Sequence, residues 1–139
     1  MSKVAVVYWS GTGNTEAMAK LVAEGINGAG AQAEVLGCAD FNSSKVGSYD
    51  AIAFGCPAMG DEVLEEGEFQ PMFDECLPSL SDKKVGLFGS YGWGTGEWMN
   101  SWEKTCKDSG VNVVGTVIAN NEPDDAAAEE CKKLGASLS

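Results

Sequence analysis

The segment SGTGNT, residues 10–15, combines two glycines with three hydroxyl side chains and one amide. It follows an apolar run and precedes a segment with helical periodicity, so we expect its backbone amides at a helix N-terminus, where the helix dipole favours an anion. Glycine lets a backbone approach a phosphate closely, and hydroxyl groups add donors. The segment predicts a site for a small phosphate dianion, formed by Ser10, Gly11, Thr12, Gly13, Asn14 and Thr15.

Two common phosphate-binding motifs do not fit this segment. A Walker A loop needs a lysine before its final Ser or Thr, and no lysine occurs between Lys3 and Lys20. A dinucleotide fingerprint G-x-G-x-x-G would need its third glycine at the position of Glu16. The segment therefore favours a phosphomonoester over ATP or NAD. A plain tight turn before a helix is the alternative that these residues leave open.

Two further loops carry residue types that suit a flat aromatic ligand. PAMGDE, residues 57–62, places Met59 where the chain leaves an apolar strand, and SYGWG, residues 90–94, places Trp93 among glycines. Because tryptophan normally buries most of its surface, a tryptophan in such a loop needs a cover from outside the core, and we expect it to stack on a planar ring. The alternatives are a methionine that fills a core gap, and a tryptophan that docks a partner protein, stays exposed or folds back onto its own loop.

The elements that position these loops follow from the hydrophobic pattern. Apolar runs typical of strands lie at residues 4–8, 33–36, 51–54, 85–88 and 113–119. Segments with helical period separate and follow them, and the weakest helix is the one over residues 40–49. This alternation predicts a single α/β domain over residues 1–139, a doubly wound five-stranded parallel sheet with helices on both faces. All three loops then follow strand carboxyl ends, where such sheets bind ligands.

Composition and charge narrow the function classes. The chain has 139 residues, and no apolar stretch approaches the roughly 18 residues that a membrane span needs. A net charge of -12 would repel nucleic acid and anionic membranes, and it favours partner proteins with basic surfaces. The chain has no histidine, the commonest general acid or base and the commonest metal ligand, which disfavours catalysis, although Cys, Asp, Glu and Lys could still do chemistry; we expect no catalytic residue and no metal site. Five cysteines without a C-x-x-C pair, and no secretory signal, indicate free thiols in a cytoplasmic protein, which we expect to be monomeric.

Together the three loops resemble those of the short-chain flavodoxins, and the resemblance continues to NNEPDD at residues 120–125. It implies the flavodoxin-like fold, with strand order 2-1-3-4-5 and non-covalently bound FMN; flavodoxin, with FMN at the β1/β3 switch point, is itself a standard example of this ligand placement. The resemblance places the 5′-phosphate at residues 10–15 and the isoalloxazine ring between Met59 and Trp93. Glu62 would accept from ring N3–H, and Asn121 would touch the ribityl chain. The implied binding set is completed by Pro57, Ala58, Gly60, Asp61, Ser90, Tyr91, Gly92 and Gly94.

The resemblance also implies a low-potential one-electron carrier, not an enzyme, that shuttles FMN between its neutral semiquinone and its anionic hydroquinone. Basic-surfaced reductases and low-potential oxidoreductases would dock transiently. Carboxylates on or after the 57–62 loop would disfavour the anion, each by about 0.4 kcal/mol at ~10 Å in a water-like dielectric. The alternative interpretation of these acidic residues is that they only form the solvent-exposed start of a helix, where acids are favoured. They are Asp61, Glu62, Glu65, Glu66 and Glu68.

Three other functions are weighed against this one. An FMN-dependent NAD(P)H quinone or nitro reductase usually needs extra chain for a second pocket. A receiver domain of the response-regulator kind needs acidic residues after its first strand and an aspartate at the end of its third, where this chain has Trp9, Ser10 and Cys56. A phosphatase that uses Cys56 needs an arginine in the following loop, and PAMGDE has no basic residue.

Substitution of Gly60→Thr tests the switch that the resemblance implies. In the family, the Gly-Asp peptide flips on one-electron reduction, and the glycine carbonyl then accepts a hydrogen bond from flavin N5. A β-branched residue hinders that flip, so we expect the semiquinone to lose about 1 kcal/mol of stabilisation, the net contribution of one hydrogen bond. The measurement is the maximal semiquinone yield in a reductive titration. An unchanged yield would contradict the assignment of Gly60.

Overall fold

Five parallel strands form one sheet, in the order β2-β1-β3-β4-β5, in the computed structural model, which describes residues 2–11, 13–59, 63–92 and 94–139. The strands are β1 (Lys3–Tyr8), β2 (Gln32–Gly37), β3 (Ala51–Gly55), β4 (Lys84–Tyr91) and β5 (Asn112–Asn120). The inner strands are buried on both faces, which explains their unbroken apolar runs, whereas β2 at one edge leaves Val35 42% exposed. The predicted fold class and strand order are confirmed.

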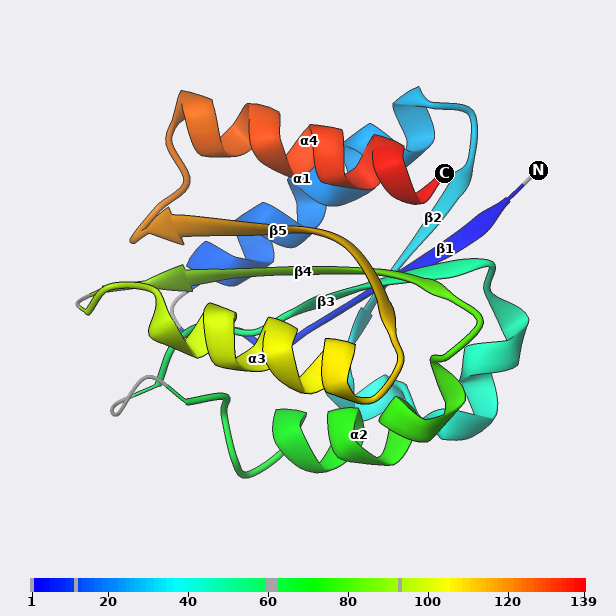
Figure 1. Cartoon of the computed structure of the whole chain (residues 1–139). Coiled ribbons are helices and arrows are strands. Elements are labelled where there is room, and N and C mark those ends of the chain that lie inside the picture. Colours follow the sequence, from blue (N-terminus) through cyan, green and yellow to red (C-terminus); the bar gives the residue numbers. More distant parts are fainter. Residues whose placement is uncertain (1, 12, 60–62, 93) are drawn as a thin grey trace.

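The helices form one layer on each face of the sheet. Figure 1 shows α1 and α4 on one face and α2 and α3 on the other. The layers separate the core into two clusters of buried side chains, one centred on Val6, Met18 and Phe88 and the other on Phe54, Phe73 and Trp102. None of the described helices is long and apolar enough to cross a membrane. The helices are α1 (Asn14–Gly28), α2 (Phe69–Cys76), α3 (Glu97–Asp108) and α4 (Asp125–Leu138).

The second crossover is not an α-helix, so the helix predicted over residues 40–49 is wrong. The chain instead forms two 3₁₀ turns, η1 (Cys38–Asp40) and η2 (Ser43–Ser48). The Asn42 side chain accepts a hydrogen bond from the Ser44 amide at 3.0 Å and thereby caps the second turn. Serines and Gly47 favour turns over a long helix, and the crossover needs only to bury Phe41, Val46 and Tyr49.

The backbones of α1 and α4 approach each other closely at two glycines. A Cβ added at Gly135 of α4 would overlap the carbonyl oxygen of Val22, and one added at Gly25 of α1 would overlap the carbonyl oxygen of Lys132. Each glycine therefore lets one helix backbone approach the other. Because α1 begins directly after residues 10–13 of the predicted phosphate loop, this contact fixes the helix on which that loop depends.

Gly135→Ala tests this contact. The added methyl group meets backbone that cannot move away, so we expect a loss of about 1–3 kcal/mol in the free energy of unfolding, measured by urea denaturation. Gly28→Ala is the matched control, since nothing lies within 4 Å of a Cβ added there. In a helix that change is neutral or stabilises by up to about 1 kcal/mol. Equal effects of the two substitutions would contradict the close contact.

Candidate functional site

The three predicted loops meet at one hollow of about 230 Å³ at the carboxyl ends of β1, β3 and β4. Strand order reverses between β1 and β3, which is where open parallel sheets bind ligands. All of the lining residues except Trp9 belong to the predicted binding set. The lining consists of Trp9, Gly11, Asn14, Pro57, Ala58, Met59, Ser90, Tyr91, Gly92 and Asn121.

The phosphate loop is organised around Ser10 and Gly13. Gly13 has φ of 95°, a left-handed conformation that favours glycine, and it forms the N-cap of α1 without a side-chain cap. Ser10 Oγ accepts from the Gly13 amide at 3.0 Å and from the Glu16 amide at 3.4 Å. The first-turn amides of Asn14 and Thr15 have no intrahelical acceptor, as at any helix start. The loop therefore turns the amides of Gly13 and Glu16 toward one oxygen acceptor at a helix N-terminus, where the helix dipole also favours an anion.

A chain of buried hydrogen bonds holds this loop against β4 and β5. Thr15, 1% exposed, accepts from the Ser90 amide through its Oγ1 at 3.4 Å. Ser90 Oγ donates to the Asn121 carbonyl at 2.7 Å, and the Asn121 amide donates to the Tyr91 carbonyl at 2.7 Å. Asn121 adopts φ of 58°, so the chain turns sharply there and its side chain lies beside Gly92. Thr15 thus lies beneath the hollow, and Ser90 lies at the point where three elements meet.

The remaining predicted residues fall in three groups. Pro57, Ala58 and Met59 form one wall, and the Ala58 amide donates to the Ser90 carbonyl at 3.0 Å across to the other wall. Gly94 has φ of 96°, is exposed and does not line the hollow. Ser10 and Gly13 also do not line it. The predictions for Thr12, Gly60, Asp61, Glu62 and Trp93 fall outside the described residues.

The loop that follows β3 is closed at its base by Cys56 and Glu65. The Met59 amide donates to the Val63 carbonyl at 2.9 Å, and the two residues form a single antiparallel bridge between the arms of the loop. The Glu65 amide donates to Cys56 Sγ at 3.3 Å. Its carboxylate accepts from the amides of Gly67, Glu68 and Phe69, each at 2.7 or 2.8 Å. Glu65 thus has two roles: its carboxylate caps the start of α2, and its backbone amide closes the base of the loop.

The titration of Glu65 and Cys56 follows from these contacts. Slight burial of the Glu65 carboxyl opposes ionisation, but hydrogen bonds from the Phe69, Glu68 and Gly67 amides outweigh it and lower its pKa. Burial raises the pKa of Cys56 to about 12. Its thiol therefore stays protonated at neutral pH and is a poor nucleophile, which argues further against the phosphatase alternative. The described residues contain no cluster of three or more potential metal ligands.

Sequence reasoning missed the supporting roles of several residues. Cys56 was weighed as a nucleophile and Glu65 as a charge, yet both hold the loop. Trp9 lines the hollow, and its amide donates to the Gly55 carbonyl at 3.0 Å. The Tyr8 hydroxyl donates to the Glu16 carboxylate at 2.8 Å and thereby holds the first turn of α1. This hydrogen bond, burial and the negative charge of Glu16 raise the pKa of Tyr8. The signal that was available for Glu65 is its position just before a helix, where acids act as caps.

The comparisons with known proteins agree with this geometry. The family model described as "Flavodoxin" matches residues 6–135. The chain is 52% identical over 132 residues to a flavodoxin of Megasphaera elsdenii, with 95% of each chain covered. It is 47% identical over 134 residues to a flavodoxin of Clostridium beijerinckii, with 96% of each covered. The solution structure of two-electron reduced M. elsdenii flavodoxin matches with a TM-score of 0.91, 51% identity and 97% coverage of each chain.

Glu65→Ala tests the closure at the base of the loop. We expect a loss of about 1 kcal/mol in the free energy of unfolding at neutral pH, typical of a lost helix cap. Because the pKa of Glu65 is lowered by folding, this contribution is present above the ordinary carboxyl pKa and disappears as pH falls through the folded value. The difference between the two proteins, measured by urea denaturation, should therefore shrink in acid.

Glu66→Ala is the control for this substitution, since it removes one negative charge from the neighbouring exposed position. It should change the free energy of unfolding by less than about 0.5 kcal/mol. If both substitutions cost the same at every pH, charge alone explains the effect, and the capping role of Glu65 is wrong.

Proposed function

This chain belongs to the flavodoxin family, and on that premise we propose that it carries single electrons at low potential, its FMN passing between neutral semiquinone and anionic hydroquinone. FMN is the cofactor. The flavin supplies the redox chemistry, while the protein binds it, covers it and shifts its potentials. The observation that carries the proposal is the convergence of the predicted residues from three loops on one hollow at the β1/β3 switch point, for which flavodoxin is a known example.

The phosphate end of FMN fits the loop before α1. In the described structure Ser10 Oγ is the oxygen that accepts from the Gly13 and Glu16 amides. A phosphate oxygen is a stronger acceptor than a hydroxyl because it is ionised, and the α1 dipole favours its charge. A Cβ added at Gly11 would lie 3.1 Å from the Trp9 ring, so glycine there lets the loop pack closely against Trp9. We therefore assign the phosphate to residues 10–15, with hydroxyl and amide donors in place of a lysine.

The planar end of FMN fits the hollow between the other two loops. Met59 and Tyr91 lie on its two sides, and neither side brings a basic side chain into the lining. We assign Met59 to the inner face of the ring and Trp93 to the outer face, with Glu62 as the acceptor for N3–H. Amides around Gly92 meet the pyrimidine oxygens, and Asn121 meets the ribityl chain. Gly60 acts as the switch that accepts from N5.

The low potential rests on the charge around the 57–62 loop. Among the described residues, Glu65, Glu66 and Glu68 follow the loop directly, and no described ion pair neutralises them. A second electron on the flavin adds negative charge next to this group, which each carboxylate disfavours by about 0.4 kcal/mol at ~10 Å in a water-like dielectric. The effect weakens as salt rises, since the Debye length is about 8 Å at physiological ionic strength. The low redox potential is therefore the combined effect of several carboxylates.

Partners follow from the same charge. A net charge of -12 steers basic surfaces toward the protein and repels nucleic acid and anionic membranes. We propose transient docking of basic-surfaced reductases and low-potential oxidoreductases to a cytoplasmic monomer, through a small interface typical of electron-transfer encounters.

A visible spectrum recorded during stepwise anaerobic reduction tests the function. FMN-loaded protein should pass through a blue neutral semiquinone before it bleaches, because the two electron steps are separated. Direct bleaching would leave FMN in place but favour the alternative, an FMN-dependent NAD(P)H quinone or nitro reductase. As a second readout, the carrier should not oxidise NAD(P)H unless a reductase is added. A colourless protein that refuses added FMN would overturn the assignment of all three loops.

A further inference from the structure

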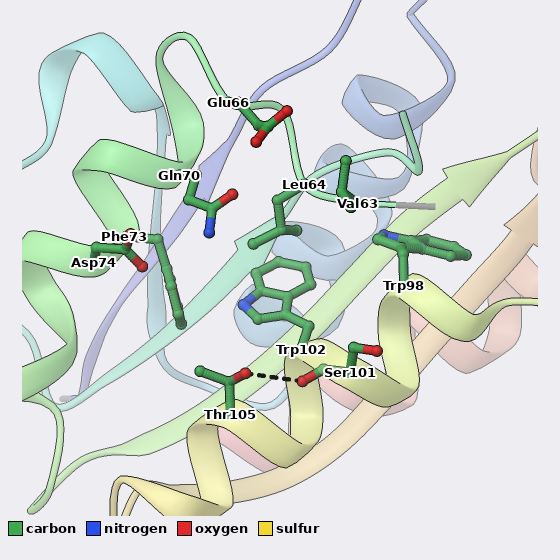
Figure 2. Close-up of a pocket in the computed structure, with 10 residues that line it drawn as sticks. All are labelled: Val63, Leu64, Glu66, Gln70, Phe73, Asp74, Trp98, Ser101, Trp102 and Thr105. Carbon is green, nitrogen blue, oxygen red and sulfur yellow. Dashed lines mark hydrogen bonds between the residues drawn. The ribbon is translucent and has the colours of Figure 1, made fainter. Parts of the chain in front are cut away.

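A second pocket lies outside the flavin hollow, between α2 and α3. It measures about 300 Å³, and it opens next to the segment that leaves the 57–62 loop. Figure 2 shows aromatic rings from both helices in its wall, with Glu66, Gln70 and Asp74 on the α2 side. The lining consists of Val63, Leu64, Glu66, Gln70, Phe73, Asp74, Trp98, Ser101, Trp102 and Thr105.

The wall of this pocket contains an unsatisfied hydrogen-bond donor. Trp102 is 3% exposed, and among the described residues its Nε1 is the buried side-chain nitrogen or oxygen that has no hydrogen-bond partner. Figure 2 shows this nitrogen on the edge of the indole that is turned toward Phe73 and Gln70. The centroids of the Phe73 and Trp102 rings lie 5.5 Å apart with an interplanar angle of 81°, and an aromatic face is only a weak acceptor. A buried donor in this state costs stability, so a carbonyl brought into the pocket has an interaction to gain.

The rim of the pocket is acidic. Glu66 and Asp74 are both exposed, and neither forms an ion pair with a described residue. The lining contains no lysine or arginine among its described members. The pocket therefore presents two carboxylates, aromatic walls and one N–H donor, which together suit a cationic group carried beside a carbonyl.

The pocket shares residues with the supports of the flavin loop. Val63, at its end, accepts a hydrogen bond from the Met59 amide at 2.9 Å. Trp98, in its wall, donates from Nε1 to the Cys56 carbonyl at 3.2 Å. Any group seated in the pocket therefore touches two residues that hold the loop assigned to the flavin.

We propose that this pocket is a docking site for the redox partner, which inserts an arginine side chain here while a peptide carbonyl of the same segment accepts from Trp102 Nε1. The inference rests on the proposed function, which calls for a basic partner. Arginine fits better than lysine because its planar guanidinium both pairs with carboxylates and stacks on aromatic rings. The Gln70 side chain moves aside to admit the carbonyl. Arginine buried in such a pocket is a frequent centre of binding energy at interfaces.

The test is a titration of ¹⁵N-labelled, FMN-loaded protein with N-acetylargininamide, followed by NMR. The probe carries both a guanidinium and amide carbonyls. We expect the Trp102 indole N–H signal, assigned by its loss in Trp102→Phe, to move in a saturable way and toward the shift of a hydrogen-bonded proton. N-acetylcitrullinamide, which has nearly the same shape without the charge, should bind about threefold to tenfold more weakly.

Charge variants separate a specific site from general attraction. Glu66→Gln combined with Asp74→Asn should weaken binding by about threefold to tenfold. Asp82→Asn combined with Glu129→Gln removes the same charge from exposed positions outside the pocket and should leave binding within about twofold. These surface variants keep the test valid even if Trp102→Phe fails to fold.

Three results would overturn the docking site. One is an indole signal that stays in place at saturating probe, and another is equal weakening by the two charge pairs. The third is a signal that moves with protein concentration alone, which would identify a second copy of this chain as the occupant. None of these three results bears on the spectrum expected during reduction. Failure of the docking site can therefore be told apart from failure of the electron-carrier function.

Discussion

The site depends on the close approach of two strand ends, at Cys56 after β3 and Gly89 in β4. A Cβ at Gly89 would overlap the Cys56 carbonyl oxygen, so the strands take these positions only because glycine stands there. The same carbonyl accepts from Trp98 Nε1, and the Cys56 amide donates to the Phe88 carbonyl at 3.1 Å. One residue thus fixes β3 to β4 and to α3 at the point where the loop assigned to the flavin begins.

From that point the supports spread in two directions. Toward α2, Cys56 Sγ accepts from Glu65, whose carboxylate starts the helix. Toward α1, the Trp9 amide donates to the Gly55 carbonyl and leads into the phosphate loop. The described ends of the glycine-rich loops are therefore held by hydrogen bonds to neighbouring strands and helices.

The sequence predicted the sheet and most of the described residues that line the hollow because each leaves a local mark, whereas the strand order came from the family resemblance. Buried strands give continuous apolar runs, and loops with glycine, hydroxyl and aromatic residues stand out after them. The helix predicted over residues 40–49 was wrong because the burial of Phe41, Val46 and Tyr49 is compatible with either a helix or two 3₁₀ turns. The roles of Cys56 and Glu65 leave no such mark, since a hydrogen bond between residues 56 and 65 depends on how the loop folds. The unsatisfied Trp102 donor is likewise visible only once α2 and α3 are packed.

Charge and fixed contacts act differently on the loop that precedes α2. The Glu65 carboxylate accepts from three amides, so part of its field is already balanced by N–H dipoles. Glu66 and Glu68 are exposed and have no such donors among the described hydrogen bonds, and Glu66 lines the second pocket. Glu65 therefore holds the loop, whereas in the proposed function the charges of Glu66 and Glu68 would lower the redox potential of the flavin. A basic partner that neutralises those neighbours would remove part of the charge that opposes the second electron, so docking and the potential are linked through the same carboxylates.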